Sequence, residues 1–439
     1  MNRMKIFDNT IAQTNVRKDS SASGARVMQL ISDARSWHFF NGQPGFFRAH
    51  GIDLHAASSP GSLQDEFGRV NKVPVYSVPI ERKLSPLSDL VSVWRLYRIL
   101  RRVRPEILHS HFSKPGIIGM AAGVLARTPI RIYHNHGMAL SSARGWRWLV
   151  LWIVEKLCCL LAHRVVYVAP SVLADAQRLG VCVPGKGRVI LSANGLDATN
   201  TFSRRLHGAE DRGLWRRSLQ IPDDAFVVGF VGRIFKIKGI EDLIHAWQQL
   251  AYQEPRLHLL LVGELDARLP ISKWAMRTIS SESRIHTAGF VENIASVYPA
   301  MDVLALPSYH EGLGYSLLEA AAMELPVIGT RIPGIVDAVL DGTNGVLVEP
   351  GQPDQLAAAI LKYMRDPQLA TAHGKAGRAF VVERFQCSVV WESILQTYDQ
   401  LLNSRLQRGR AGESRSNIGS DAYPSAVIEE RASNAGLNN

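Results

Sequence analysis

Short apolar runs alternate with amphipathic, helix-like stretches along most of the chain. The first convincing apolar run is Val27–Ile31. Further runs in the first half lie at 107–108, 130–133, 165–168 and 189–191. Between them lie helical patterns such as Leu90–Arg102 and Lys114–Ala126. This alternation predicts a parallel sheet covered by helices on both faces.

The alternation restarts after a polar, charged connector at 200–222. Apolar runs in the second half lie at 226–231, 257–262, 303–306, 327–328 and 346–348. We therefore expect an α/β protein with two Rossmann-like parallel-sheet domains in sequence. In such sheets ligands bind beyond the carboxyl ends of the strands, so the residues that follow the apolar runs are the candidates for chemistry.

The same pattern predicts the domain boundaries. A loose extension over 1–25 precedes a first domain over 26–205, and a second domain covers 206–384. A helix at 385–403 is expected to pack back on the first domain. Residues 404–439 are rich in Arg, Ser, Gly and Asn, and this composition predicts a disordered tail.

Composition fits this organisation. A chain of 439 residues with 46% hydrophobic residues can build two full cores. The formal charge of +11 is uneven: residues 1–205 hold 28 Lys+Arg against 12 Asp+Glu, a net of +16, and the remainder has a net of −5. The first half therefore suits an anionic partner. Three partners are possible: an acidic membrane surface, a phosphate-bearing lipid or nucleic acid. The four cysteines lack metal-site spacing and are expected to be reduced.

Two basic segments contain tryptophan. Val91–Arg104 places Trp94, Tyr97, Leu100 and Val103 on one helical side beside several arginines, and Arg144–Lys156 adds three tryptophans. Such segments suit peripheral binding to the cytoplasmic leaflet of an anionic membrane, or core packing with a solvated edge. No N-terminal signal peptide is visible. The apolar segment Trp148–Val168 is interrupted by charged residues, so we expect a buried or interfacial helix rather than a span.

The first chemical cluster follows the apolar run at 226–231. Gly232 lets the backbone approach a ligand, and Arg233 and Lys238 flank the start of a predicted helix at Gly239–Gln249. Two cations near a helix N-terminus suit a diphosphate. A solvated basic turn is the alternative.

The second cluster follows the run at 303–306. Glu311 precedes a predicted helix and Glu319 lies inside it, with Gly312 and Gly314 between them. The glycines free the backbone to approach phosphate or sugar oxygens, and the carboxylates accept hydrogen bonds from sugar hydroxyls. A helix cap followed by a surface glutamate is the alternative.

Four histidines of the first half lie at or just past strand ends. They are His109, His111, His134 and His136. Single histidines are usually structural, but these are expected to face the cleft, and His136 is the strongest functional candidate among them.

The second cluster resembles the E-x7-E motif of the family 4 retaining glycosyltransferases of the GT-B fold. Arg233 and Lys238 match the conserved Arg and Lys of that family, and the resemblance runs over about 26–402. The pattern His-x-His-x-x-Lys-x-Gly from His109, followed by the strand end His136-Gly137, is most similar to bacterial capsule and exopolysaccharide enzymes. Those enzymes resemble each other in using UDP-sugars and lipid-diphosphate-linked acceptors.

The resemblance implies an acceptor-binding first domain, a donor-binding second domain and a role for each candidate. Arg233 and Lys238 would hold the donor diphosphate and stabilise the leaving group, and Glu319 would bind the ribose. Glu311 would bind hydroxyls of the transferred sugar, helped by main-chain groups of Gly312, Leu313 and Gly314. Phe290 and Val291 would lie near the base, and His136 would face the sugar from across the cleft.

Metal and cofactor independence is also expected, because no Asp-x-Asp pair stands in a suitable loop and fixed cations can stabilise the leaving group. The chain departs from the family in three places. Ser32–Ser36 replaces a Gly-Gly loop, Leu313 replaces a common Phe, and Gly314-Tyr315-Ser316 differs from the usual Pro-Arg of the capsule subgroup.

Three other functions stay open at this stage. A UDP-sugar 2-epimerase of the same fold would need further acid/base carboxylates. A nucleic-acid-binding protein fits the basic charge, but the paired glutamates would repel phosphate, so we expect no nucleic-acid partner. A catalytically inactive scaffold subunit is the third. The expected partners are a nucleotide-sugar, a saccharide or polyprenyl-diphosphate-linked acceptor, and an anionic membrane surface.

Overall fold

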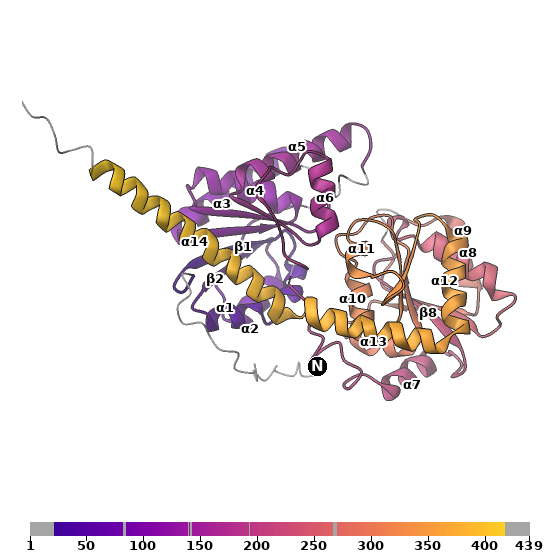
Figure 1. Ribbon diagram of the computed structural model, residues 1–439. Helices are drawn as coiled ribbons and strands as arrows, with labels where there is room; N and C mark the ends of the chain where they lie inside the picture. Colours follow the sequence, from indigo (N-terminus) through magenta and orange to yellow (C-terminus); the bar gives the residue numbers. More distant parts are fainter. Residues whose placement is uncertain are drawn as a thin grey trace, which may run out of the picture.

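The computed structural model describes residues 22–81, 85–138, 140, 143–192, 194–266 and 270–417, with the backbone alone for 408–417. It consists of two α/β domains that lie side by side, each built on a parallel sheet (Figure 1). This confirms the predicted fold class. Of the extension expected at 1–25, residues 1–21 lie outside the described residues, as does the tail beyond 417. Residues 22–25 pack on the first domain, where Ala22 is buried and its N–H donates to Asp399.

The first domain has a seven-stranded sheet of order β3-β2-β1-β4-β5-β6-β7, and every described pairing is parallel. Its strands are β1 Arg26–Leu30, β2 Asp53–Ser58, β3 Val75–Ser77, β4 Ile107–His111, β5 Ile130–Asn135, β6 Arg164–Tyr167 and β7 Gly187–Val189. Its helices are η1 Ala34–Phe40, α1 Gln43–Ala49, α2 Ser62–Asn71, α3 Pro86–Val103, α4 Ser113–Leu125, α5 Trp146–Leu161 and α6 Pro170–Arg178.

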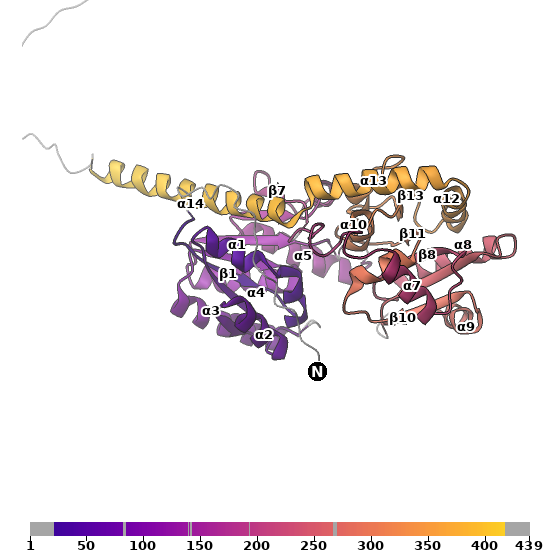
Figure 2. The same cartoon turned by 90° about the horizontal axis from the view of Figure 1, so that it is seen from below.

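Side chains of successive strand residues enter different cores on the two faces of this sheet. Val27 packs with Trp37 and Phe47 beneath η1 and α1, whereas Met28 packs with Leu96 and Ile118 beneath α3 and α4. This alternation follows from the period of two of an extended strand. Helices α3, α4 and α5 cover one face, and α1, α2 and α14 cover the other (Figures 1 and 2).

The second domain has a six-stranded parallel sheet of order β10-β9-β8-β11-β12-β13. Its strands are β8 Phe226–Val231, β9 Leu257–Val262, β10 Ile285–Gly289, β11 Val303–Leu306, β12 Val327–Thr330 and β13 Gly345–Val348. Its helices are α7 Ala209–Ser218, η3 Lys236–Lys238, α8 Ile240–Ala251, α9 Lys273–Ser281, η4 Ile294–Ser296, η5 Tyr298–Ala300, α10 Tyr315–Ala322, α11 Ile335–Ala338, α12 Pro353–Arg365 and α13 Pro367–Arg384. Strands β9 and β11 are buried throughout, as central strands of a doubly covered sheet should be.

Two consecutive helices join the domains along one side (Figure 2). Helix α13 packs on the second domain, and α14 (Cys387–Asn417) crosses to the first, where Trp391 contacts Phe46. The stretch expected to be disordered from residue 404 is therefore helical as far as Asn417. Its Arg, Gln, Glu and Ala residues are good helix formers, so they continue the helix beyond its last packed turn.

Within the described chain, no helix combines the length and apolarity that crossing a bilayer requires. The apolar segment Trp148–Val168 is divided between α5 and β6. Glu155, Cys158 and Cys159 form the buried face of α5, so this segment is a core-packed helix with an outer face.

Candidate active site

The predicted donor residues follow the carboxyl ends of adjacent strands of the second sheet. Gly232 follows β8 with φ +146°, and its N–H donates to the Val262 carbonyl at 2.9 Å. A Cβ at Gly263 would lie 2.0 Å from the Gly232 carbonyl oxygen. The positive φ of both residues and the close approach at Gly263 require glycine, which lets the two strand ends run close together.

Lys238 and Glu311 form an ion pair in this edge region. Glu311 also accepts a hydrogen bond from Ser308 Oγ at 2.8 Å. The lysine and glutamate side chains are only 18% and 12% exposed. Gly239, at φ +70°, has its Cα so near the Pro307 carbonyl oxygen that a Cβ would lie 2.0 Å away, which brings the lysine turn onto the glutamate loop. The cation predicted for the diphosphate and the carboxylate predicted for the sugar are thus one cluster.

Arg233 lies at the same edge but has different partners. Its Nη1 donates to Asp266 at 2.8 Å, and its guanidinium lies 5.0 Å from the Phe235 ring centre. The side chain is mostly exposed, so it is available to an anion that binds at this edge of the sheet. Sequence reasoning missed Asp266, although its place just beyond β9 was a usable signal.

Glu319 lies on α10, separate from Glu311. Its carboxylate accepts a hydrogen bond from Tyr298 Oη at 2.5 Å. Burial raises the pKa of Glu319 to about 7, and the tyrosine bond opposes this rise. Sequence reasoning also missed Tyr298, because no sequence motif marks a buried tyrosine in a 3-10 turn. A hydroxyl donor from a ligand would favour the ionised form of this carboxyl group.

The glycine loop between the two glutamates ends at the N-terminus of α10. Gly314 is the cap residue at φ +66°, and no side chain caps the helix. The first N–H groups of α10 can therefore meet an anion. The Leu313 side chain is buried in the core, so only its main chain is placed to contact a donor.

The residues predicted near the base lie further along the same edge. Phe290 and Val291 directly follow β10, and the Phe290 side chain is 74% exposed. The Gly263 N–H donates to the Gly289 carbonyl at 2.8 Å, which joins this loop to the end of β9. Because the sheet order is β10-β9-β8-β11, these two residues are separated from Glu311 by two strands.

His136 approaches the glycine loop from the first domain. A Cβ at Gly312 would lie 1.9 Å from the His136 carbonyl oxygen, so the two domains touch backbone to backbone here. The imidazole stacks on Phe112 at 4.1 Å between ring centres, and its Nε2 lies 3.0 Å from His111 Nδ1. Burial lowers the pKa of His136 to about 3. At neutral pH it is therefore a neutral hydrogen-bonding group and not a cation.

The other three histidines do not face the cleft as expected. His109 Nδ1 is bonded to Tyr398 Oη of α14 at 2.7 Å, and its Nε2 lies 3.2 Å from His134 Nδ1. His111 packs edge-on against Phe40. One ring nitrogen from each of the three lies within 4.8 Å of the others. The rings of His109 and His134 are nearly parallel, and the His136 ring centre lies 4.6 Å from that of His134 and 5.2 Å from that of His111.

Two further contacts join the domains, and neither was predicted. Ser171 Oγ donates to Asp337 and accepts from the Gly334 N–H at 2.7 Å. Ser192 and Tyr315 are bonded through their hydroxyl groups. These contacts lie beside the His136–Gly312 approach, so the structure represents a state in which the domains are in contact around the site.

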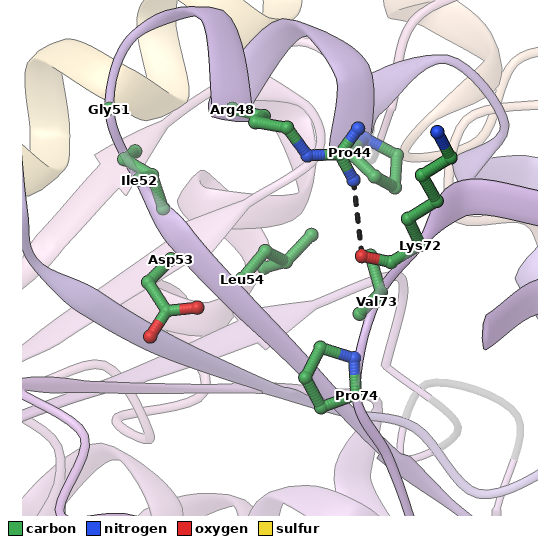
Figure 3. A pocket seen from close by; sticks show the side chains of 9 residues that line it. All are labelled: Pro44, Arg48, Gly51, Ile52, Asp53, Leu54, Lys72, Val73 and Pro74. Atoms are coloured by element: carbon green, nitrogen blue, oxygen red, sulfur yellow. Dashed lines mark hydrogen bonds between the residues drawn. The ribbon is translucent and has the colours of Figure 1, made fainter. Parts of the chain in front are cut away.

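A separate hollow lies in the first domain between the end of α1 and β2 (Figure 3). Arg48 at its rim donates to the Lys72 carbonyl at 3.2 Å, and Asp53 is paired with Arg26 at 2.8 Å. Arg48 and Asp53 therefore contact the chain itself, and none of the candidate residues lines this hollow.

Two family profiles match this chain. "Glycosyl transferase 4-like domain" matches residues 47–194, and "Glycosyl transferases group 1" matches residues 211–380. The first match lies within the first domain and the second within the second domain, which includes Arg233, Lys238 and both glutamates.

Curated relatives and solved structures agree with these matches. The capsular polysaccharide biosynthesis glycosyltransferase CapM of Staphylococcus aureus is 27% identical over 377 residues, which cover 86% of this chain and 97% of the relative. An Escherichia coli UDP-Gal:alpha-D-GlcNAc-diphosphoundecaprenol alpha-1,3-galactosyltransferase is 25% identical, covering 68% and 77%. Anabaena HepE in complex with UDP superposes with a TM-score of 0.71 at 21% identity, covering 85% and 100%. The resemblance in fold and family is thereby confirmed.

Proposed function

We propose that this chain, which belongs to the family 4 glycosyltransferases and has the GT-B fold, is a retaining enzyme that uses a UDP-sugar. Its acceptor is proposed to be a lipid-diphosphate-linked saccharide in cell-surface polysaccharide synthesis. The observation that carries the proposal is the cluster of Lys238, Glu311 and Ser308 beside the uncapped start of α10.

This cluster suits transfer chemistry. A departing nucleotide diphosphate gains negative charge, and Lys238, Arg233 and the N–H groups of α10 are fixed positive groups that favour that charge. The donor C1–O bond breaks, the diphosphate takes the electron pair, and the acceptor oxygen bonds to C1. The resemblance implies that the acceptor attacks on the leaving-group face, and we propose that its proton passes to a diphosphate oxygen, which balances the step.

The carboxylate of Glu311 is engaged by two groups, Lys238 and Ser308. Both groups bind the same oxygen, Oε1, so they hold the carboxylate in place and leave Oε2 to accept from sugar hydroxyls. We propose retention without a covalent enzyme intermediate, as the resemblance to the family implies.

Two relatives support the choice of substrates. The E. coli relative is described as acting on UDP-Gal and a diphosphoundecaprenol-linked sugar, and it covers two thirds of this chain. HepE has been crystallised with UDP and with UDP-glucose. We propose the same nucleotide, UDP, and the same class of acceptor for this chain, and we assign no particular sugar.

Titration of the purified protein with UDP, GDP and ADP, without added metal, tests the donor. We expect UDP to bind at least about tenfold more tightly than the other two, because a base pocket discriminates through hydrogen bonds that a different base leaves unpaired. Equal binding of the three nucleotides, or none, would contradict the UDP assignment. Release of UDP from UDP-sugars with a polyprenyl-diphosphate-sugar acceptor then tests the transfer.

Peripheral membrane binding is the second part of the proposal. Helix α5 carries an exposed apolar stripe, the α5 outer stripe, made of Trp146, Leu149, Ile153, Leu157 and Leu160. Helix α3 adds Leu87, Leu90, Val91 and Trp94 with exposed arginines beside them. The prediction that Trp94, Leu100 and Val103 share one side of α3 is wrong. Leu100 and Val103 are buried, whereas Trp94 lies on the exposed side of the helix. An apolar stripe with basic flanks suits an anionic bilayer surface.

Co-sedimentation with vesicles tests this surface. Leu149→Glu is expected to lower binding to vesicles rich in anionic lipid by at least about tenfold, because it loses the ~1.5–3 kcal/mol of a buried leucine and adds repulsion. Tyr252→Glu is the matched control, since Tyr252 is 94% exposed on the second domain. Equal loss in both variants, or no binding of the parent protein at low salt, would contradict the proposal.

A further inference from the structure

A buried carboxylate on α5 lies directly behind the His136–Gly137 turn. Glu155 is only 2% exposed, and it belongs to the inner face of a helix whose outer face carries the α5 outer stripe. It accepts hydrogen bonds from Ser113 Oγ, from Tyr133 Oη at 2.8 Å and from Asn135 Nδ2 at 3.1 Å. Burial raises the pKa of Glu155, and the three hydrogen bonds oppose that rise.

Asn135 connects this carboxylate to the turn. Its Nδ2 donates to Glu155, and its Oδ1 accepts the Gly137 N–H at 2.9 Å. The orientation of the Asn135 side-chain amide is therefore fixed, because Glu155 needs a donor and the Gly137 N–H needs an acceptor. Gly137, at φ +116°, is in turn so close to Gly312 that a Cβ would lie 2.8 Å from the Gly312 Cα.

The His-x-His-x-x-Lys-x-Gly pattern, which runs from His109 to Gly116, also contacts this carboxylate through the first turn of α4. Ser113 begins α4 and bonds to Glu155. Gly116, one turn later, leaves room for the Tyr133 ring, because a Cβ there would lie 2.6 Å from that ring. The spacing Ser-x-x-Gly thus places one donor on Glu155 and lets a second donor reach it. This gives the motif a structural purpose that does not require contact with substrate.

We infer that Glu155 and Asn135 are positioning residues for the His136–Gly137 turn, which they hold against the glycine loop of the donor domain. The expected effect on kcat rests on the proposed function. The expected effect on the position of the His136–Gly137 turn rests on geometry alone. Helix α5 then joins the surface proposed to meet lipid with the acceptor side of the cleft, since Glu155 and the α5 outer stripe lie on opposite faces of one helix.

Hydrogen exchange at the Gly137 amide tests the positioning role without any assay of transfer. Glu155→Ala is expected to speed exchange of this amide by at least about tenfold, and Glu155→Gln to leave it within about threefold, because glutamine keeps an acceptor for Tyr133 and Asn135. Gln64→Ala is the matched control, since Gln64 is equally buried and bonds to the Tyr76 carbonyl at the far edge of the same sheet. A protected Gly137 amide in folded Glu155→Ala would overturn the inference.

Kinetics provide the second readout. Glu155→Ala is expected to lower kcat about tenfold, the effect of a lost supporting hydrogen bond, while the affinity for UDP changes less than about twofold. If Glu155→Ala does not fold, Asn135→Ala makes the same test, because it removes the link and leaves Glu155 two donors. A fall in UDP affinity equal to the fall in kcat would overturn the inference. If the parent protein transfers no sugar, the proposed function fails, and the exchange result still decides the positioning role.

Discussion

Replacing Lys238 by alanine is expected to lower kcat by about 10²–10³-fold while UDP affinity changes much less. The Lys238 side chain is only 18% exposed and its ammonium group is fixed by Glu311, so it is preorganised before the donor arrives. Removing one fixed donor from a site of developing negative charge costs about 2.7–4 kcal/mol in the transition state. Steady-state kinetics with a UDP-sugar, together with calorimetric binding of UDP, separate the two effects.

The matched control is Lys236→Ala, in the same 3-10 turn. Lys236 is exposed, so its loss removes a positive charge nearby without breaking the pair. Lys238→Ala also leaves Glu311 without its counter-ion. The double variant Lys238→Ala/Glu311→Gln, set beside the two single variants, measures how much of the effect comes from this stranded carboxylate. Equal kcat in Lys238→Ala and Lys236→Ala would contradict the assignment of Lys238.

The pair also shows what sequence patterns can and cannot predict. Gly232, Lys238, Glu311 and Gly314 each follow a strand, and the carboxyl ends of parallel strands meet at one edge, so their common location was predictable. Their bonding was not, because the approach of the Lys238 turn to the Glu311 loop depends on how closely the backbone at Gly239 packs on Pro307. Such packing across elements leaves no periodic signal.

The histidines show a second limit. A position at the end of a strand predicted a cleft-facing side chain for all four. Residues two apart on a strand face the same side of the sheet, however, and α14 returns from the C-terminus to cover that side at His109. Tyr398 of that helix bonds to His109, so a residue 289 positions away decides that His109 is buried. His136 alone lies one residue past its strand, where the turn meets Gly312.

The supporting residues are the least predictable part of the site. Asp266, Tyr298 and Asp337 each contact a candidate residue or a domain boundary, but each is a common residue type in an ordinary loop or turn. Glu155 appeared in the sequence only as an interruption of an apolar helix. The positioning role that we propose for it follows from contacts that the fold creates, because β5 places Tyr133 and Asn135 within hydrogen-bonding distance of α5.

UDP binding is expected to weaken by about tenfold between pH 8 and pH 6, and Glu319 is the cause. Burial holds the pKa of this carboxyl group at about 7 in the free protein. If ribose hydroxyls donate to it, the bound state favours the carboxylate and its pKa falls. At pH 6 most molecules must then release a proton to bind UDP, and each pH unit below the free pKa costs about 1.36 kcal/mol. Affinity therefore rises with pH through 7 and levels off above it.

Glu319→Gln separates this carboxylate from other titrating groups. Glutamine resembles the protonated carboxyl group, so at pH 8 the variant should bind UDP about as weakly as the parent protein does at pH 6. The phosphate of UDP can also titrate in this range, but it does so equally in both proteins, and the difference between their pH profiles isolates Glu319. Calorimetry in buffers of different ionisation enthalpy counts the released proton directly. Identical pH profiles for the two proteins would show that Glu319 does not bind the nucleotide, and Tyr298 would then be its sole partner among the contacts described above.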